Sequence, residues 1–264
     1  MNNAEKRAKG GETFLFCHGA TSCGFYWRKV ADILNELGHK TLAADMPGHG
    51  LDMTAEIGDM TMDDYARRAV DLARREGRKV ILVGHSMGGG VITSAAELCP
   101  ECVEKLIYVT AHMPLPGNSM NGMEDSLQPI DWAAGSEDGK TVPDAYMSIY
   151  RGEGEPPLAH MSAATAEACS RYATCESLSV LTLPLKHTRE RWGSVPRYYV
   201  QTMQDAALWT ALQQQYIDYW GCDAVYRMDS DHGVPCAAPI ELAFILHDIA
   251  GERWRERVHE TEIL

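Results

Sequence analysis

The sequence predicts an α/β fold, in which a mostly parallel central sheet is flanked by helices and interrupted by an inserted cap. Three observations predict this fold. Short apolar runs alternate with amphipathic helical stretches, 264 residues suit one core domain, and a long proline-rich interval breaks the alternation. Hydrophobic residues make up 45% and charged residues 23% of the chain, so it can bury a substantial core.

The first elements are a strand, a helix and a second strand. Residues 13–17 (TFLFC) form an apolar run typical of a buried strand. A helix follows, whose apolar side chains recur at helical spacing and share one face: Val30, Ile33, Leu34 and Leu37. Gly38 fits the position just after the end of this helix, and residues 39–44 form the next strand.

The middle of the chain repeats this alternation. Thr61 and Asp64 have the spacing of an N-terminal capping pair for a helix that runs to Arg75. A strand at residues 79–83, a helix at 87–98 and a strand at 104–110 follow. The remaining predicted elements lie nearer the C-terminus: strands at 197–202 and 224–228, and helices at 209–219 and 239–249.

The interval 113–195 departs from this pattern. It is rich in Met and Gly, lacks a convincing apolar strand and holds seven of the prolines, among them Pro114, Pro116, Pro129, Pro143, Pro156 and Pro157. A loop of that length without structure of its own is uncommon. The sequence therefore predicts a core domain formed by residues 1–112 and 196–264, with residues 113–195 inserted as a cap.

The charge balance limits the classes of partner. The formal net charge is −13, and an acidic surface repels nucleic-acid backbones and anionic lipid. The sequence begins with a polar, basic stretch and has no apolar run of membrane-spanning length, so we expect a cytoplasmic protein without nucleic-acid or membrane partners. A homodimer is compatible with the sequence.

The eight cysteines are expected to be reduced thiols in a chain of this length and class. Cys99 and Cys102 form a C-x-x-C motif, but no second pair and no nearby histidine completes a zinc site. We therefore interpret the pair as a packing feature at a helix end, and we expect no metal.

The most specific motif is Gly84-His85-Ser86-Met87-Gly88, which matches G-x-S-x-G between a predicted strand and a predicted helix. Such a sharp turn projects the Ser86 hydroxyl above the sheet, at a helix N-terminus that favours developing negative charge. The alternative is a glycine-rich turn whose serine caps the helix. A phosphate-binding loop would need a lysine after its last glycine, and this sequence has none there.

An oxyanion hole needs two backbone N–H donors. Met87 supplies one in the expected turn, and we assign the other to Ala20, in the loop after the first strand. His18 and His85 lie beside these donors, and we interpret both as side chains that support the turns.

The general base and its acid partner should follow the last two strands, in the chain order Ser, acid, His. His232 follows the strand at 224–228 and precedes the final helix, so it is the candidate base. Asp205 lies three residues after the strand at 197–202, where its carboxylate would orient His232 and stabilise the imidazolium. Asp223, Asp229 and Asp231 are weaker candidates.

Several segments resemble the plant methylesterase and hydroxynitrile lyase family, with its bacterial esterase relatives, within the α/β-hydrolase fold. They are HGATSCGFYWRKVADILNELGHKTLAADMPGHGLD, KVILVGHSMGG, RERWGSVPRYYVQTMQD and DSDHGVP. The resemblance implies a cap over a small, mostly apolar pocket, no cofactor, and the same five site residues. It also implies that Trp132, in PIDW, lines the substrate pocket, although this tryptophan fits the packing of the cap equally well.

Two departures bear on the chemistry. The cyanohydrin lyases of that family carry Thr where this chain has Gly19 and Lys where it has Gly233. Because the lyase reaction needs that cation beside cyanide, hydrolysis of a small carboxylic ester is the favoured function. A lyase, cyclising or rearranging enzyme that uses the same site is the alternative, and a non-catalytic ligand receptor on this scaffold is a third hypothesis.

Overall fold

The computed structural model describes residues 11–52, 56–120, 136, 138–142, 175–205 and 207–251. Trp132 and most of the interval that the sequence assigns to a cap lie outside these residues. The division into a core and an inserted cap therefore stays a prediction. Along the chain, this interval follows the fourth strand of the sheet and precedes the fifth.

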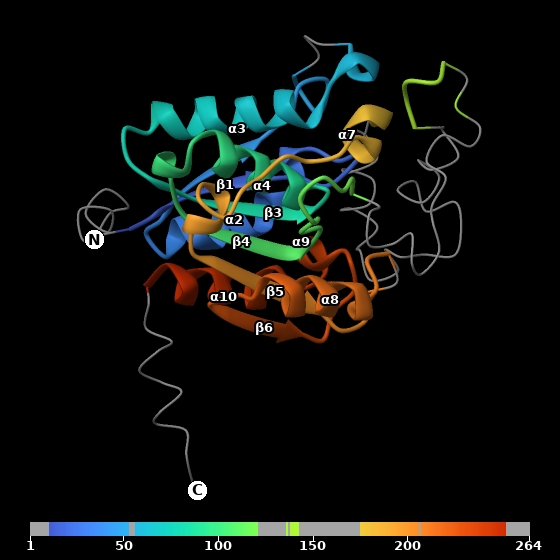
Figure 1. Cartoon of the computed structure of the whole chain (residues 1–264). Coiled ribbons are helices and arrows are strands. Elements are labelled where there is room, and N and C mark those ends of the chain that lie inside the picture. The colour runs from blue at the N-terminus through green and yellow to red at the C-terminus, as the bar shows by residue number, and fades with distance from the viewer. Residues whose placement is uncertain are drawn as a thin grey trace, which may run out of the picture.

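Six parallel strands form one sheet in the order β2-β1-β3-β4-β5-β6 (Figure 1). Their bounds are β1 Thr13–Cys17, β2 Lys40–Ala44, β3 Val80–Ser86, β4 Val103–Ala111, β5 Arg197–Thr202 and β6 Ala224–Met228. The predicted parallel sheet is confirmed. Because all strands run the same way, their carboxyl ends and the loops that follow meet at one edge, where α/β proteins bind ligands.

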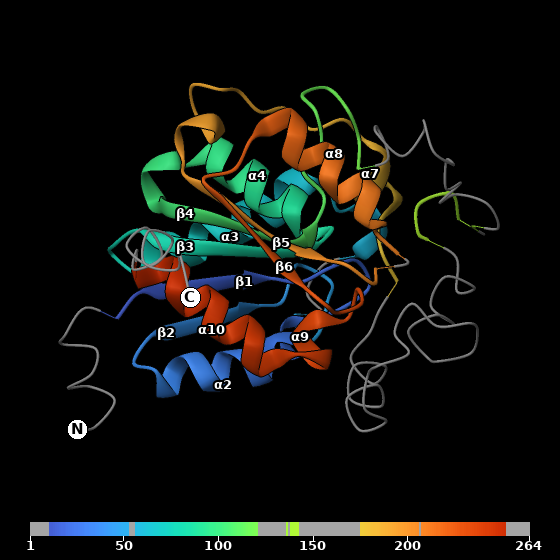
Figure 2. The same cartoon turned by 90° about the horizontal axis from the view of Figure 1, so that it is seen from below.

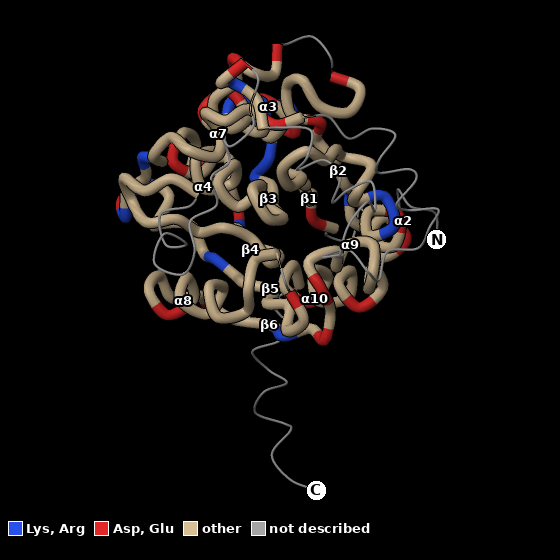
Figure 3. The backbone as a smooth tube through the Cα atoms, turned by 90° about the vertical axis from the view of Figure 1, so that its right-hand side faces the viewer, with Lys and Arg blue, Asp and Glu red and all other residues tan. Residues whose placement is uncertain are grey.

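Helices cover both faces of the sheet (Figures 2 and 3). One face carries α2 (Arg28–Glu36), α9 (Val234–Ala237) and α10 (Pro239–Gly251), and the other carries α3 (Met62–Arg75), α4 (Gly88–Leu98), α7 (Leu178–Thr182) and α8 (Thr210–Trp220). Short 3-10 turns lie at Gly24–Trp27, Ile57–Asp59, Pro100–Cys102 and Trp192–Ser194. The helices predicted from apolar periodicity are confirmed, with ends that shift by one or two residues.

Alternating strand residues supply the two cores. On β1, Phe14 and Phe16 pack with Trp27 beneath one face, whereas Leu15 packs with Tyr65 beneath the other. All five side chains are fully buried. Side chains of a strand point alternately to the two faces, so a strand covered on both sides is apolar along most of its length, as residues 14–17 of β1 are.

Local signals set the helix ends. The Thr61 side chain accepts from Asp64 N–H, and the Asp64 carboxylate accepts from Thr61 N–H, which completes the predicted capping box of α3. After α2, Gly38 has φ 99°, a left-handed conformation that glycine adopts without strain. Both predictions are confirmed.

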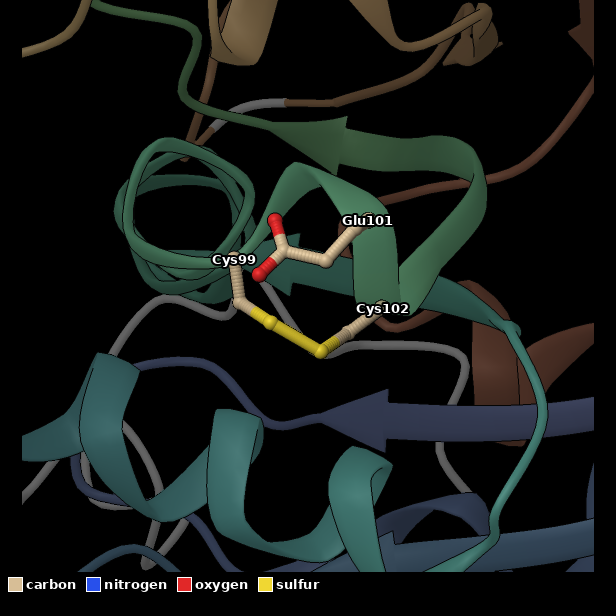
Figure 4. A group of neighbouring side chains, drawn as sticks. All are labelled: Cys99, Glu101 and Cys102. Atoms are coloured by element: carbon tan, nitrogen blue, oxygen red, sulfur yellow. A yellow bond between two sulfur atoms is a disulfide. The ribbon is translucent and has the colours of Figure 1, made fainter.

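Cys99 and Cys102 are joined by a disulfide, so the expectation of a reduced pair was wrong (Figure 4). The turn after α4 brings their Cα atoms to 5.4 Å, within the range that a disulfide spans. Glu101 extends beside the two sulfur atoms. Since both sulfurs are bonded to each other, they are not thiolate ligands, and this group does not form a metal site in this state.

Acidic residues are spread around the described core, near α2, α3, α8 and α10, rather than gathered on one face (Figure 3). Among the helices of the described residues, none combines the length and the apolarity needed to cross a bilayer.

Candidate active site

Ser86 ends β3 and has φ 52°, a left-handed conformation that is unusual for a residue with a side chain. The neighbouring glycines make this turn possible. A Cβ on Gly84 would lie 2.4 Å from the Gly88 carbonyl oxygen, and one on Gly88 would lie 2.5 Å from that of Cys17. The chain thus turns sharply from β3 into α4, and the strain is concentrated at the candidate nucleophile.

The loop after β1 lies directly against this turn. A Cβ on Gly19 would lie 3.0 Å from Ser86 Cβ and 3.1 Å from His85 Nδ1. Ala20 and Met87 are buried beside it, and among the hydrogen bonds of the described residues none uses either backbone N–H. Buried N–H groups normally have an acceptor, so this pair is suited to binding an oxygen of a ligand.

Asp205 and His232 are in direct contact, although 27 residues separate them. His232 Nδ1 lies 2.8 Å from Asp205 Oδ2, and both residues are buried. The other carboxylate oxygen, Oδ1, accepts from the backbone N–H groups of Ala207 and Leu208, each at 2.8 Å. A carboxylate held in this way fixes the orientation of the imidazole that it contacts.

Three further side chains donate to Asp205 Oδ2, and sequence reasoning missed all of them. They are the hydroxyls of Thr110 and Thr202 and the amide of Gln213. Thr110 has φ 36° at the end of β4, beside a register shift between β3 and β4. Its position at the end of the predicted strand at 104–110 is the only sequence signal that pointed to this neighbourhood.

His85 links the serine turn to the histidine loop. Its Nε2–H donates to the His232 carbonyl oxygen at 2.8 Å, and the two ring centroids lie 4.7 Å apart. His232 therefore lies beside the turn that carries Ser86. Within the described residues, no hydrogen bond joins the Ser86 hydroxyl to His232. Catalytic contacts of this kind often tighten only when substrate binds.

The charges of the pair follow from its surroundings. Burial acts to lower the pKa of His232, but the Asp205 carboxylate outweighs burial and raises that pKa above its usual value. Burial acts to raise the pKa of Asp205, but His232 and the hydrogen bonds lower it. The arrangement thus stabilises an imidazolium beside a carboxylate, as a general base requires after it accepts a proton.

The competing candidates have other contacts. Asp223 accepts from Arg197 N–H, Asp229 from the Gln204 amide and Asp231 from Gly233 N–H. His18 is buried; its Nε2 accepts from Met46 N–H, and its pKa is lowered to about 4 by burial. A neutral, hydrogen-bonded ring fits the supporting role that the sequence suggested for it.

A family model described as "Alpha/beta hydrolase family" matches residues 14–243. The chain belongs to the alpha/beta hydrolase family. Both the serine turn and the acid–histidine pair lie within the matched residues, and the parallel sheet with its strained serine turn is the architecture that such hydrolases share.

Two relatives and one solved structure illustrate how this hydrolase compares with known proteins. A chloroplastic protein of Arabidopsis thaliana that carries the name methylesterase 11 is 28% identical over 255 residues, which cover 90% of this chain and 63% of that protein. The pyrethroid hydrolase of Sphingobium wenxiniae is 28% identical, with 89% and 86% of the two chains covered. The crystal structure of polyneuridine aldehyde esterase has a TM-score of 0.76 at 24% identity, with 91% and 99% covered.

Proposed function

We propose that this hydrolase cleaves a small carboxylic ester through Ser86, His232 and Asp205. Ser86 attacks the ester carbonyl while His232 accepts its proton, and the N–H groups of Ala20 and Met87 bind the resulting oxyanion. His232 then protonates the departing alcohol. Water repeats the sequence on the acyl-enzyme and releases the acid.

The contact between Asp205 and His232, beside a serine with φ 52°, carries this proposal. Each feature has its own cost. A left-handed serine is strained, and a buried carboxylate loses hydration. Strained residues and buried charges are concentrated at functional sites. In general-base activation of a serine, the strained turn exposes the hydroxyl and the buried carboxylate orients the histidine.

The proposed substrate is an ester of an apolar acid, with a methyl ester as the first choice. The names of two relatives, methylesterase and pyrethroid hydrolase, support hydrolysis as the reaction, and the first supports a methyl ester as the substrate. We further propose that residues 113–195 form a cap over the pocket and that Trp132 lines the pocket. Both proposals rest on the family resemblance. The proposal needs no cofactor and no metal.

The cyanohydrin reaction is disfavoured by two positions beside the site. Gly19 has no hydroxyl to offer, and its Cα lies so close to Ser86 that an added Cβ would be 3.0 Å from Ser86 Cβ. Gly233, directly after His232, provides no cation for a leaving cyanide. A panel of cyanohydrins assayed beside esters separates the two activities.

Rapid mixing with p-nitrophenyl acetate tests the proposal. A burst of p-nitrophenol equal to the enzyme concentration, followed by slower turnover, is the result expected of an acyl-enzyme. Ser86→Ala should abolish both phases. Absence of hydrolysis by the wild-type protein over a panel of methyl and p-nitrophenyl esters would contradict the proposed function.

A further inference from the structure

Glu176 is fully buried, yet its carboxylate is surrounded by polar groups from four separate parts of the chain. Oε1 accepts from the Tyr65 hydroxyl at 2.7 Å and from Ser177 N–H at 3.0 Å. Oε2 accepts from Thr21 N–H at 3.2 Å and lies 3.2 Å from His49 Nε2. None of these residues belongs to the proposed triad, so this carboxylate has no part in the chemistry already described.

The contact with Thr21 reaches the oxyanion loop itself. Thr21 follows Ala20, one of the two proposed oxyanion donors, and has φ 58°. Its hydroxyl donates to the Ala20 carbonyl oxygen at 2.7 Å, and its N–H donates to Glu176. The carbonyl and the N–H of the Ala20–Thr21 peptide are therefore both hydrogen-bonded. These two bonds stabilise the strained φ of Thr21.

The preceding peptide, Gly19–Ala20, is hydrogen-bonded through its carbonyl oxygen. The Gly19 carbonyl oxygen lies 2.8 Å from His18 Nδ1 and accepts from Ser22 N–H at 3.4 Å. Because a peptide unit is planar, fixing that carbonyl also fixes the direction of Ala20 N–H. Glu176 and His18 thus orient two consecutive peptides, and the donor between them remains unbonded among the described residues.

His49 supplies the counter-charge for Glu176. Both side chains are fully buried, and His49 Nε2 lies 3.2 Å from Glu176 Oε2. Burial opposes both charges, but the mutual attraction prevails, raising the pKa of His49 and lowering that of Glu176. The His49 ring also lies 4.9 Å from that of His18.

Glu176 lies where residues 140–142 and residues 176–178 come together. Thr141 and Ser177 form an antiparallel bridge, in which Val142 N–H donates to the Glu176 carbonyl oxygen at 2.8 Å. The residue that contacts the oxyanion loop through its side chain therefore also joins these two segments through its backbone.

We propose that Glu176, held by His49 and Tyr65, is a positioning residue that aims the Ala20 N–H into the oxyanion hole through its hydrogen bond with Thr21. This inference rests on the proposed function. It predicts that Glu176 acts on the tetrahedral state of the reaction and not on ground-state binding of the ester, because the hole binds the oxyanion more strongly than a carbonyl.

Two substitutions of Glu176 test this role in the full-length protein. Glu176→Met keeps the approximate length but removes every acceptor, whereas Glu176→Gln keeps one acceptor oxygen. We expect Glu176→Met to lower kcat about tenfold or more, with KM within about twofold of wild type. Glu176→Gln should recover part of that loss. Rates are expressed per phosphonate-titrated serine, so that unfolded protein does not contribute.

A trifluoromethyl ketone analogue of the ester supplies the decisive readout. Such a ketone forms a tetrahedral adduct with a nucleophilic serine and places an oxyanion in the hole. Its inhibition constant should rise in parallel with the loss of kcat/KM. The matched control is Glu76→Met, which removes the ion pair between Glu76 and Lys40. Lys40 begins β2, at the end of the strands away from the site, so this variant should change neither kcat/KM nor the inhibition constant.

Tyr65→Phe and Tyr108→Phe provide a second comparison if Glu176→Met fails to fold. Each removes one buried hydroxyl: Tyr65 donates to Glu176, whereas Tyr108 accepts from Trp192 Nε1–H and contacts Thr93. We expect Tyr65→Phe to lower kcat about threefold and to weaken the ketone equally, and Tyr108→Phe to lower only the melting temperature.

The outcomes separate the two proposals. A wild-type protein without ester hydrolysis contradicts the proposed function. A wild-type protein that hydrolyses esters, with Glu176→Met or Tyr65→Phe variants that retain wild-type kcat and ketone affinity, overturns the positioning role alone.

Discussion

The Thr110 hydroxyl donates a hydrogen bond to the Asp205 carboxylate, although Thr110, the penultimate residue of β4, has φ 36° and 95 residues separate the two. The strained threonine thus bonds the same oxygen, Oδ2, that contacts His232. A hydrogen bond at this point stabilises the ionised form of Asp205 and restricts its rotation. The orientation of His232 therefore depends on a residue outside the triad.

Thr110→Val should expose this dependence. Valine has the shape of threonine and the same branching at Cβ, so the backbone strain is unchanged while the donor is lost. We expect kcat to fall about fivefold and the free energy of unfolding to fall by about 1–2 kcal/mol. Thr110→Ser, which keeps the hydroxyl, should retain most of the activity. Equal kcat for valine and threonine would show that the bond has no catalytic effect.

Asp205→Asn should change both the rate and its pH dependence. Asparagine removes the charge that raises the pKa of His232, so that pKa should fall. The base must be neutral to act, and the acid limb of kcat/KM should therefore move to lower pH while kcat drops about 10³–10⁴-fold. The pH profiles of the two proteins, measured from pH 4 to 9, provide the comparison. An acid limb that stays in place or moves to higher pH would contradict the assigned partner.

Gly19→Ala should impair the site by crowding alone. The added methyl would lie 3.0 Å from Ser86 Cβ and 3.1 Å from His85 Nδ1, closer than such contacts usually are. Because small displacements at a reacting group reduce rates strongly, we expect kcat/KM to fall about tenfold or more. Gly193→Ala is the control, since its methyl would meet nothing nearer than 3.4 Å. Comparable activity of the two variants would mean that the contact is readily relieved.

Thr61→Ala should affect stability without affecting catalysis. The substitution removes the side chain that caps α3, at a cost of about 1 kcal/mol in unfolding free energy. For a chain of this size that corresponds to a melting temperature lower by about 2–4 °C. Thr61→Ser should stay near wild type, and kcat should be unchanged in both. A loss of kcat in the alanine variant would instead connect the start of α3 to the site.

The sequence was sufficient for the parts of the molecule that depend on local pattern. Apolar periodicity predicted the strands and helices of the sheet, because burial on one or two faces imposes those repeats. The serine turn was recognisable since Gly84 and Gly88 are required by close backbone contacts that no other residue permits. The candidate acid and base followed from the order of strands in such a fold.

Contacts between side chains that are far apart along the chain could not be predicted from the sequence. Glu176 lies in a segment with no strand or helix pattern, and nothing nearby indicates that its partners are Tyr65, His49 and Thr21. Thr110 appeared only as the end of a strand. The disulfide of Cys99 and Cys102 was missed because composition and length favoured reduced thiols, whereas bonding depends on the geometry of one turn.

Reaction with a serine-directed fluorophosphonate, followed by peptide mapping, tests most directly whether Ser86 is a nucleophile activated by His232. We expect one adduct per chain, on Ser86, with labelling slowed by a competing ester substrate. Labelling should be abolished in Ser86→Ala and slowed by about 10³-fold or more in His232→Ala. Modification of a different serine, or undiminished labelling of Ser86 in the His232→Ala variant, would contradict this expectation.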